Sequence, residues 1–378
     1  MLGGSSKLLK ALNEAAALGH LLDRGQLTRA ELRTLTGLSK PTVSEAIRRL
    51  TEADLVHTVG HETGRPGPNA EVYAVRPDAA YAVAMSVRDC APSLTAALYD
   101  LRGEQRARIA AQVDFARTDP LAAVDDMIDA LCAAAGVSRE PVAHLQLAVA
   151  GAFDPRDRVI HHVDVPRWSR PGLVDELADR LGVAVEVDND VNLAALAERA
   201  HGAAQGAEGF VLLWLGDSGL GLAIDLGGGT LLRGARGAAG EIGYMPVIAE
   251  HSRDFHDLVS GDAVRALAAA RGLPEAEMFG DAAFVGELAA RIALGLSAVL
   301  AVLDPPLVVL GGELGRAGGE ALAEPVAKSV YHPGSPEPLE TVIAVSTVDD
   351  DAPLLGAAGA AVSAVRETLL AALRQPTP

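Results

Sequence analysis

From residue 81 onward the chain alternates between short apolar runs and longer amphipathic stretches. Apolar runs such as 145–149 and 307–310 lack alternating polar residues, which is typical of strands buried on both faces. This alternation predicts an α/β body built of two similar halves with a cleft between them. We expect strands at 81–87, 94–101, 104–113, 145–149, 184–187, 209–215, 220–225 and 307–310, helices at 120–135, 173–181, 191–200, 262–270 and 284–303, and a terminal helix.

The residues before this body have a different pattern, which predicts three helices followed by a hairpin. We refer to residues 1–76 as the head and to residues 77–378 as the body. Capping residues mark the helix starts, and Gly25 and Gly37 mark two ends. The first helix should run from Lys7 to about Asp23, capped by Ser5 or Ser6, with Leu8, Leu12, Ala15 and Leu22 on its buried side; the second starts at Thr28 with a Thr28/Glu31 capping box; the third runs from Ser39 to about Ala53.

The third helix has the features of a helix that enters the DNA major groove. Val43, Ile47 and Leu50 follow helical spacing and should face the core. The outer face then carries small hydroxyl residues, which permit close approach to bases, and two arginines that can reach bases or phosphates. An ordinary helical hairpin is the alternative. We predict DNA contacts from Ser39, Lys40, Thr42, Ser44, Glu45, Arg48 and Arg49.

The hairpin that follows resembles the wing of a winged helix-turn-helix. Two predicted strands, 55–59 and 71–75, enclose a tip rich in Gly and Pro. Within that tip, Gly64-Arg65-Pro66-Gly67 places Arg65 on a stiff backbone suited to a minor groove or a phosphate. A polar loop without a DNA contact is the alternative. Arg76-Pro77-Asp78 marks the expected end of the head.

Charge is distributed unevenly between head and body. The whole chain has a net charge of −18, but the head carries ten basic and eight acidic residues, a net of +2, which leaves −20 on the body. DNA binding is therefore expected from the head alone. Two cysteines are too few for a disulfide framework or a Cys-rich zinc site, and we expect neither a signal peptide nor a membrane span. A cytoplasmic protein fits these features.

Several short motifs, taken in order, resemble the ROK family (repressor, open reading frame, kinase). The resemblance implies a winged helix-turn-helix on a two-lobed, actin-like ATPase (ribonuclease H-like) body, with domains at 1–76, 77–200 and 201–378. The motifs are the start of the third helix at 39–44, the wing at 64–67, Trp168, Leu181-Gly182-Val183, Asp188-Asn189-Asp190, the segment 216–221, Ala239-Gly240-Glu241-Ile242-Gly243 and Leu310-Gly311-Gly312.

The first phosphate loop of the family's kinases, Asp-x-Gly-x-Thr, is not conserved in this sequence. The corresponding segment is Arg88-Asp89-Cys90-Ala91-Pro92, so a cation stands where the family has its magnesium-binding Asp. Residues 225–230 fit the same pattern, but they lie where the family has a plain hairpin turn, and we expect a turn there. We therefore predict no catalytic residues, no phosphoryl transfer and no cofactor.

The resemblance also implies a ligand site in the cleft. Asp190 matches the family's general base, and Asn189 and Glu241 match residues that bind sugar hydroxyls; helix capping is the alternative for the strand-helix junction. Tyr244 stands where the family has His. The family's Cys-rich segment has lost every cysteine here, and His256 lies nearest its last Glu, so we predict no metal site from His251, His256 or Asp257.

These features together predict a transcriptional regulator, a repressor, that binds an inverted-repeat duplex operator as a homodimer or higher even oligomer. A sugar or sugar derivative is the expected effector, near Asn189, Asp190, Glu241, Tyr244 and His256. Two alternatives remain: an active ATP-dependent sugar kinase, and a regulator whose body serves only as a dimerisation scaffold.

Overall fold

The N-terminal head has the predicted winged helix-turn-helix fold. The computed structural model describes residues 2–62, 70–217, 219–246, 254–330, 340–349 and 351–375. In the head, a small antiparallel sheet of order β1-β3-β2 packs against three helices. The wing tip with Arg65 lies outside the described residues. The head elements are α1 (Leu2–Arg24), β1 (Gln26–Thr28), α2 (Arg29–Thr36), α3 (Lys40–Glu52), β2 (Val56–Glu62) and β3 (Ala70–Val75).

Local capping signals set the ends of α2 and α3, as predicted. Thr28 and Glu31 form a reciprocal capping box, and Ser39 Oγ accepts a hydrogen bond from the backbone N–H of Thr42 at 3.4 Å. Gly37 ends α2 with φ of 69°, a left-handed conformation that glycine adopts without strain. These signals need only nearby residues, which is why the sequence predicts them well.

The prediction for the first helix was wrong in two respects. α1 begins at Leu2, so Ser5 and Ser6 lie within the helix and not at its start. Leu8 and Leu12 are each 44% exposed, because the helix is rotated relative to the predicted stripe. Ala15 is buried as predicted, and the rest of the face that packs on the core consists of Ala11, Leu18 and Leu21.

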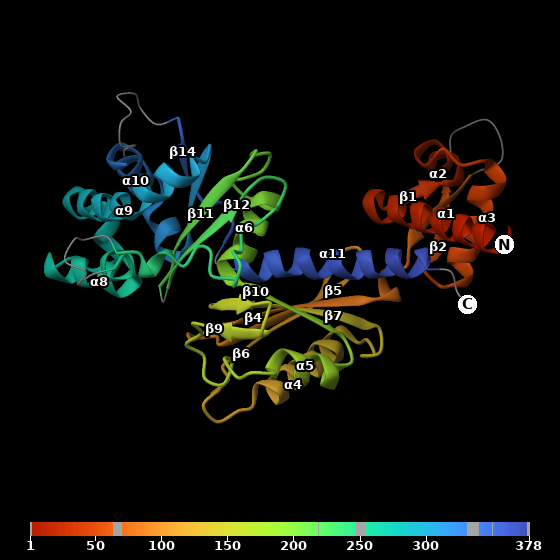
Figure 1. Cartoon of the computed structure of the whole chain (residues 1–378), viewed down its shortest axis with the longest axis horizontal. Coiled ribbons are helices and arrows are strands. Elements are labelled where there is room, and N and C mark those ends of the chain that lie inside the picture. Colours follow the sequence, from red (N-terminus) through yellow and green to blue (C-terminus); the bar gives the residue numbers. More distant parts are fainter. Residues whose placement is uncertain are drawn as a thin grey trace.

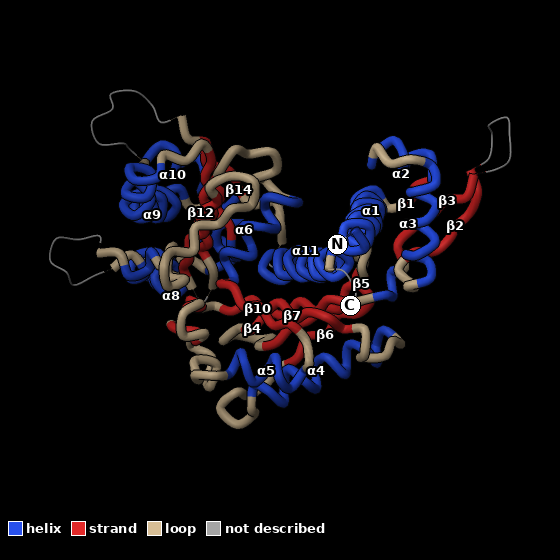
Figure 2. Tube along the Cα trace, turned by 45° about the vertical axis from the view of Figure 1, so that its right-hand side comes forward, coloured by secondary structure: helices blue, strands red, loops and turns tan. Residues whose placement is uncertain are grey.

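The first lobe is a five-stranded sheet of order β10-β7-β4-β5-β6, covered by helices on both faces (Figure 2). Val83 and Met85 of the central strand face α4 and α5, whereas Ala82 and Ala84 face α11. The small alanines let α11 pack close to the sheet. The elements are β4 (Tyr81–Val87), β5 (Leu94–Asp100), β6 (Gln105–Ala111), α4 (Pro120–Ala135), β7 (Val142–Val149), α5 (Leu173–Leu181), β10 (Ala184–Asn189) and α11 (Ala352–Arg374).

The second lobe is a four-stranded sheet of order β12-β11-β13-β14. Its largest core lies between this sheet and α8, α9 and α10, while α6 covers the other face. The elements are α6 (Asp190–His201), β11 (Phe210–Leu215), β12 (Leu220–Asp225), α7 (His256–Val259), α8 (Gly261–Ala270), α9 (Ala282–Leu303), β13 (Leu307–Gly311), α10 (Gly312–Ser329) and β14 (Val342–Val345).

The C-terminal helix α11 joins the three parts of the molecule. In Figure 1 it runs from the junction of the two lobes to the head, where it reaches α1. Leu369, Leu370 and Leu373 near its end pack on the same core as Leu18 and Leu21 of α1. The head is therefore held against the body by apolar contacts and not only by the chain connection near residue 76. The predicted domain limits stay a prediction.

Two helices, α9 and α11, are long and apolar enough to cross a membrane by length and composition alone. Both are part of the folded protein. Phe284, Ile292 and Leu296 of α9 are buried in the core of the second lobe, and α11 packs against β4, β7, α6 and α1. Packing in the core accounts for their apolar character.

Several elements had no counterpart in the sequence prediction. The prediction missed the hairpin of β8 (Ala152–Asp154) and β9 (Val159–His161), which follows β7. It also missed β14, a strand of only four residues. α10 was missed because its sequence contains four glycines at 312, 315, 318 and 319 together with Pro325, all of which oppose helix formation in isolation. The helix is interrupted at Gly319, where φ is 51° and ψ is −148°, and the segments on either side are stabilised by burial of Leu314, Leu322 and Val326.

Candidate functional site

A cavity of about 370 Å³ lies between the two lobes. It is bounded by the end of β4, the β10-α6 junction, the turn between β11 and β12, the segment around 239–244, and the first residues of α7, α10 and α11. The structure brings all five predicted effector residues to its wall: Asn189, Asp190, Glu241, Tyr244 and His256. These residues come from three separate parts of the chain.

Asn189 and Asp190 have different roles at the start of α6. Asn189 Oδ1 accepts hydrogen bonds from the backbone N–H of Val191 at 2.9 Å and of Asn192 at 3.2 Å, and its Nδ2 donates to the Gly151 carbonyl. The capping interpretation therefore holds for Asn189. Asp190 is the first residue of the helix, and its Oδ1 accepts a bond from Val191 N–H at 2.9 Å.

The carboxyls of Asp190 and Glu241 are both harder to ionise than usual. Burial raises the pKa of Asp190 to about 6; the Val191 N–H and Arg88 oppose this shift, and the Glu241 charge adds to it. Burial also raises the pKa of Glu241. Two desolvated carboxyls on one cavity wall are suited to accept hydrogen bonds from ligand hydroxyls or amines.

At another part of the cavity, Arg88 forms an ion pair with a residue that the sequence analysis did not single out. Its Nη2 lies 2.7 Å from Oε1 of Glu313, which is near the start of α10. The other oxygen, Glu313 Oε2, accepts a hydrogen bond from the backbone N–H of Asp217 at 3.3 Å. The position of Glu313 directly after Leu310-Gly311-Gly312 is the signal that could have found it.

The second phosphate-loop pattern, at 225–230, forms the predicted turn. Leu226 N–H donates to the Thr230 carbonyl at 2.8 Å, and the three glycines 227–229 all have positive φ. None of these residues lies on the cavity wall. The Asp225 carboxylate pairs with Arg199 of α6, so its role is structural.

Tyr244 and His256 lie on the second-lobe side of the cavity. Tyr244 is 64% exposed, and its ring centroid is 5.5 Å from that of His162, another residue of the wall. His256 begins α7 and lies close to Gly243, where an added Cβ would be 3.6 Å from the His256 Cβ. His251, the other histidine considered as a ligand, lies outside the described residues.

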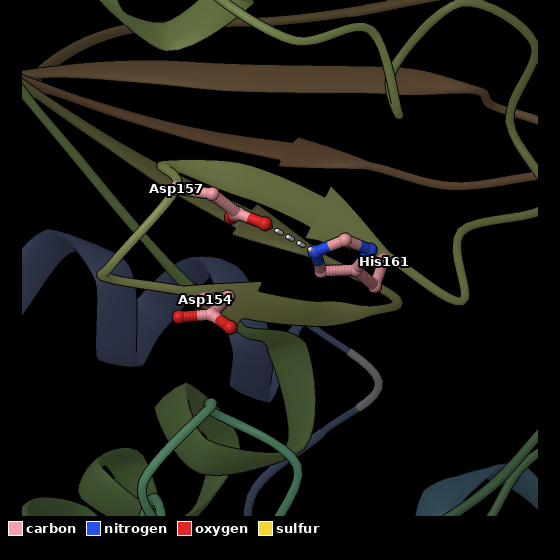
Figure 3. A group of neighbouring side chains, drawn as sticks. All are labelled: Asp154, Asp157 and His161. Atoms are coloured by element: carbon pink, nitrogen blue, oxygen red, sulfur yellow. Dashed lines mark hydrogen bonds and ion pairs between the residues drawn. The ribbon is translucent and has the colours of Figure 1, made fainter.

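A group of three possible metal ligands occurs elsewhere, in the β8-β9 hairpin. Oxygen and nitrogen atoms of Asp154, Asp157 and His161 lie within 4.8 Å of one another (Figure 3). Both carboxylates already accept backbone bonds of the turn, from Arg156 and Val159, and His161 Nε2 is 3.2 Å from Asp157 Oδ2. These contacts explain the cluster as part of the hairpin, and the absence of a metal stays a prediction.

On the head, the predicted DNA-contacting residues of α3 form one polar surface. Arg48 binds both oxygens of Glu45, at 2.7 and 3.0 Å, and also pairs with Glu52. Arg49 pairs with Glu45 at 3.0 Å and with Glu14 of α1 at 3.3 Å. Hydrogen bonds from the two arginines lower the pKa of Glu45 to about 2. The remaining members are Ser39, Lys40, Thr42 and Ser44, none of them buried.

Comparisons with known proteins agree with this arrangement. The ROK family matches residues 85–363 and the MarR family matches residues 11–65. The xylose repressor of Bacillus subtilis is 24% identical over 63% of this chain and 61% of its own length. A glucokinase of Halalkalibacterium halodurans is 34% identical over 34% of this chain and 38% of its own length.

Among solved structures, a ROK family transcriptional regulator, a homologue of the E. coli MLC protein, superposes with a TM-score of 0.74 at 20% identity. That superposition covers 97% of this chain and 99% of the other, and it shows the shared fold. By sequence, the chain matches about three fifths of the length of the first curated relatives. Relatives include both regulators and kinases. The ROK match covers well over half of the residues, and the chain belongs to the ROK family.

Proposed function

We propose that this protein is a DNA-binding transcriptional repressor whose ROK body binds a sugar-like effector between its lobes. One observation carries the proposal: α11 connects the cavity to the head. Its first residues, Pro353 and Leu354, line the cavity, and its last turns pack on α1 of the head. A change in the cavity that moves α11 therefore moves the surface on which the head rests.

The head would bind DNA through α3. Its N-terminal residues are small and polar, and the arginines stand one to two turns further along, as a helix in the major groove requires. A head with a net charge of only +2 binds weakly by itself, so two heads acting together give the necessary affinity. A two-fold homodimer would read an inverted repeat with half-sites about 34 Å, or a multiple of that, apart.

Effector binding would change DNA binding because the effector has different affinities for two conformations of the body. A ligand that binds better to one arrangement of the lobes shifts the population toward it, and operator affinity changes by the same coupling free energy. The related repressor named for xylose supports a sugar as the class of effector. Asn189, Asp190, Glu241, Tyr244 and His256 are the proposed contacts.

We further propose that the body does not transfer phosphate. Arg88 brings a cation where a magnesium ligand would be needed, and its guanidinium is already paired with Glu313. Because kinases are among the relatives, the alternative is tested directly: sugar-dependent formation of ADP that is lost in Asp190→Asn would establish kinase activity.

The main experiment measures operator affinity and ligand binding together. Operator DNA is first selected from a random pool with the purified full-length protein, and its affinity is then measured with and without a panel of free, amino and phosphorylated sugars. We expect one sugar class to change operator affinity and to raise the melting temperature. Asp190→Ala and Glu241→Ala should each weaken that ligand by about tenfold or more, since each removes a hydrogen bond to a charged group.

Glu320→Ala, an exposed carboxylate on α10 that does not line the cavity, is the matched control and should bind ligand normally. A ligand that changes operator affinity equally in wild type and in both cavity variants would show that the effector binds elsewhere. If no sugar binds at millimolar concentration, the body acts only as a scaffold.

A further inference from the structure

Glu313 lies where hydrogen-bond donors from two distant segments meet at the cavity. It is the second residue of α10, whose first helical segment ends at Gly319, where the backbone is non-helical with φ of 51° and ψ of −148°. Its Oε1 is 2.7 Å from Arg88 Nη2, and its Oε2 accepts the Asp217 N–H at 3.3 Å. The Glu313 side chain is only 19% exposed, and that of Arg88 is 30% exposed.

This set of donors is the kind that binds an anion. A guanidinium and a loop backbone N–H both favour negative charge, and together they match the two oxygens of a carboxylate or two oxygens of a phosphate. In this chain the anion is a side chain of the protein itself. Arg88 and Glu313 are 225 residues apart and belong to different lobes, so the contact is not a by-product of local helix geometry.

The rest of the cavity wall is unfavourable for a second anion. Arg88 is the only Lys or Arg among the described residues of the wall, and Glu313 already neutralises it. The other charged groups are carboxylates, of which Asp351 is paired with Arg108. The carboxylate charges that are unpaired among the described residues repel a phosphate by Coulomb's law, most strongly where the site is desolvated. The carboxylates of the wall are Asp89, Asp164, Asp190, Glu241, Asp254 and Asp351.

We propose that Glu313 occupies the anion position of this cavity and thereby restricts it to ligands without a phosphate group. This inference rests on the proposed function, in which the cavity binds the effector, and it narrows the effector to a neutral or amine-bearing sugar. Glu313 acts as a specificity-determining residue: its carboxylate takes the donors that a sugar phosphate would need.

The test is a gain of anion binding when the charge of Glu313 is removed. Calorimetry is performed on full-length wild type, Glu313→Gln, Glu313→Ala and the double variant Arg88→Gln/Glu313→Gln, with inorganic pyrophosphate as the probe. We expect pyrophosphate to bind Glu313→Gln and Glu313→Ala on the order of tenfold more tightly than wild type, because a guanidinium and a backbone N–H are released. The double variant should lose this gain.

Glu320→Gln on the same helix controls for the loss of one negative charge, and it should bind pyrophosphate as wild type does. A gain in the Glu313 variants no larger than in Glu320→Gln overturns the proposal. Thermal unfolding verifies that the variants fold.

A second calorimetric experiment uses only the wild-type protein. It compares the binding of glucose with that of glucose 6-phosphate, and the binding of mannose with that of mannose 6-phosphate. Tighter binding of either phosphate ester than of the free sugar also overturns the proposal.

The outcomes separate this inference from the proposed function. If no free sugar binds wild type but the Glu313 variants gain pyrophosphate, the sugar-sensor proposal fails and the anion position is established. If a free sugar binds and shifts operator affinity but the variants gain nothing, the sensor stands and the role of Glu313 is refuted.

Discussion

The recognition helix α3 and the cavity each pair an arginine with a glutamate at 2.7 Å, but the two pairs differ in sequence separation and in burial. On α3, Arg48 and Glu45 are three residues apart and about half exposed. In the cavity, Arg88 and Glu313 come from different lobes and are mostly buried. The α3 pair is therefore one that solvent or a DNA phosphate can replace at little cost, whereas the cavity pair is fixed by the fold around it.

The two regions also shift acid pKa values in opposite directions. Hydrogen bonds from Arg48 and Arg49 lower the pKa of Glu45 to about 2, while burial raises the pKa of Asp190 to about 6. The head thus presents charges that stay ionised and exchange partners, as binding to a polyanion requires. The cavity holds carboxyls whose charge is costly to the fold, as is common at ligand sites.

The largest expected effect comes from removing an arginine of α3. Arg48→Ala should weaken binding to the selected operator by about tenfold or more, and it should reduce preference for one base pair if Arg48 contacts a base edge. Affinity is measured by fluorescence anisotropy at several salt concentrations. Arg117→Ala, which removes an 88% exposed arginine of the body, is the control and should leave operator affinity unchanged.

If Arg48→Ala and Arg117→Ala lower operator affinity equally, Arg48 of α3 does not contact DNA. The exposure of the Arg48–Glu45 pair then has no role in DNA binding, and its contrast with the buried Arg88–Glu313 pair has no functional meaning.

The same contrast explains what could be predicted from the sequence. In the head, the ends of α2 and α3 follow from Thr28, Gly37 and Ser39, each of which acts on neighbours within about three residues. In the body, most strands and the helices 120–135 and 173–181 follow from local patterns of apolar residues. The cavity residues came instead from the family resemblance.

The local sequence patterns could not predict contacts between residues that are far apart in the chain. No local signal pairs Arg88 with Glu313, because the pairing depends on how the two lobes meet. The exposure of Leu8 and Leu12 on α1 was missed for the same reason, since the rotation of α1 is set by its packing on α3 and α11. α10 forms because the second lobe buries Leu314, Leu322 and Val326, although its local sequence opposes a helix.

An intermediate effect is expected on stability when the charge of Asp190 is removed. Its pKa is raised from an ordinary 3.8 to about 6, so the folded state binds the proton more tightly than the unfolded state. This favourable contribution is complete below about pH 3.8 and is lost as the pH rises through about 6. Asp190→Asn should therefore stabilise the protein by about 1–2 kcal/mol at pH 7, with a smaller difference at pH 4.

Denaturant unfolding at pH 4, 5, 6 and 7 measures this difference, and Asn preserves the acceptor for the Val191 N–H. A stability difference between wild type and Asp190→Asn that does not change between pH 4 and pH 7 would contradict the assignment of a desolvated carboxyl to the cavity. Glu45→Gln should show the opposite sign at neutral pH, because the two arginines favour the charged form of Glu45.

The smallest expected effect is on DNA affinity when Glu45 is neutralised. Glu45 holds Arg48 through both carboxylate oxygens and also binds Arg49. Glu45→Gln removes a negative charge from the DNA-facing surface and loosens both arginines, so affinity for random duplex DNA should rise about two- to fivefold and depend more steeply on salt. Glu320→Gln in the body should leave affinity for random DNA unchanged, because α10 lies on the opposite side of the molecule from α3 (Figure 1). If Glu45→Gln instead lowers operator affinity while leaving binding to random DNA unchanged, Glu45 accepts a hydrogen bond from a base, as a carboxylate does from cytosine. In that case the Arg48–Glu45 pair is fixed by the operator, and the distinction between exchangeable pairs on the head and fixed pairs in the cavity would hold only for the protein free of DNA.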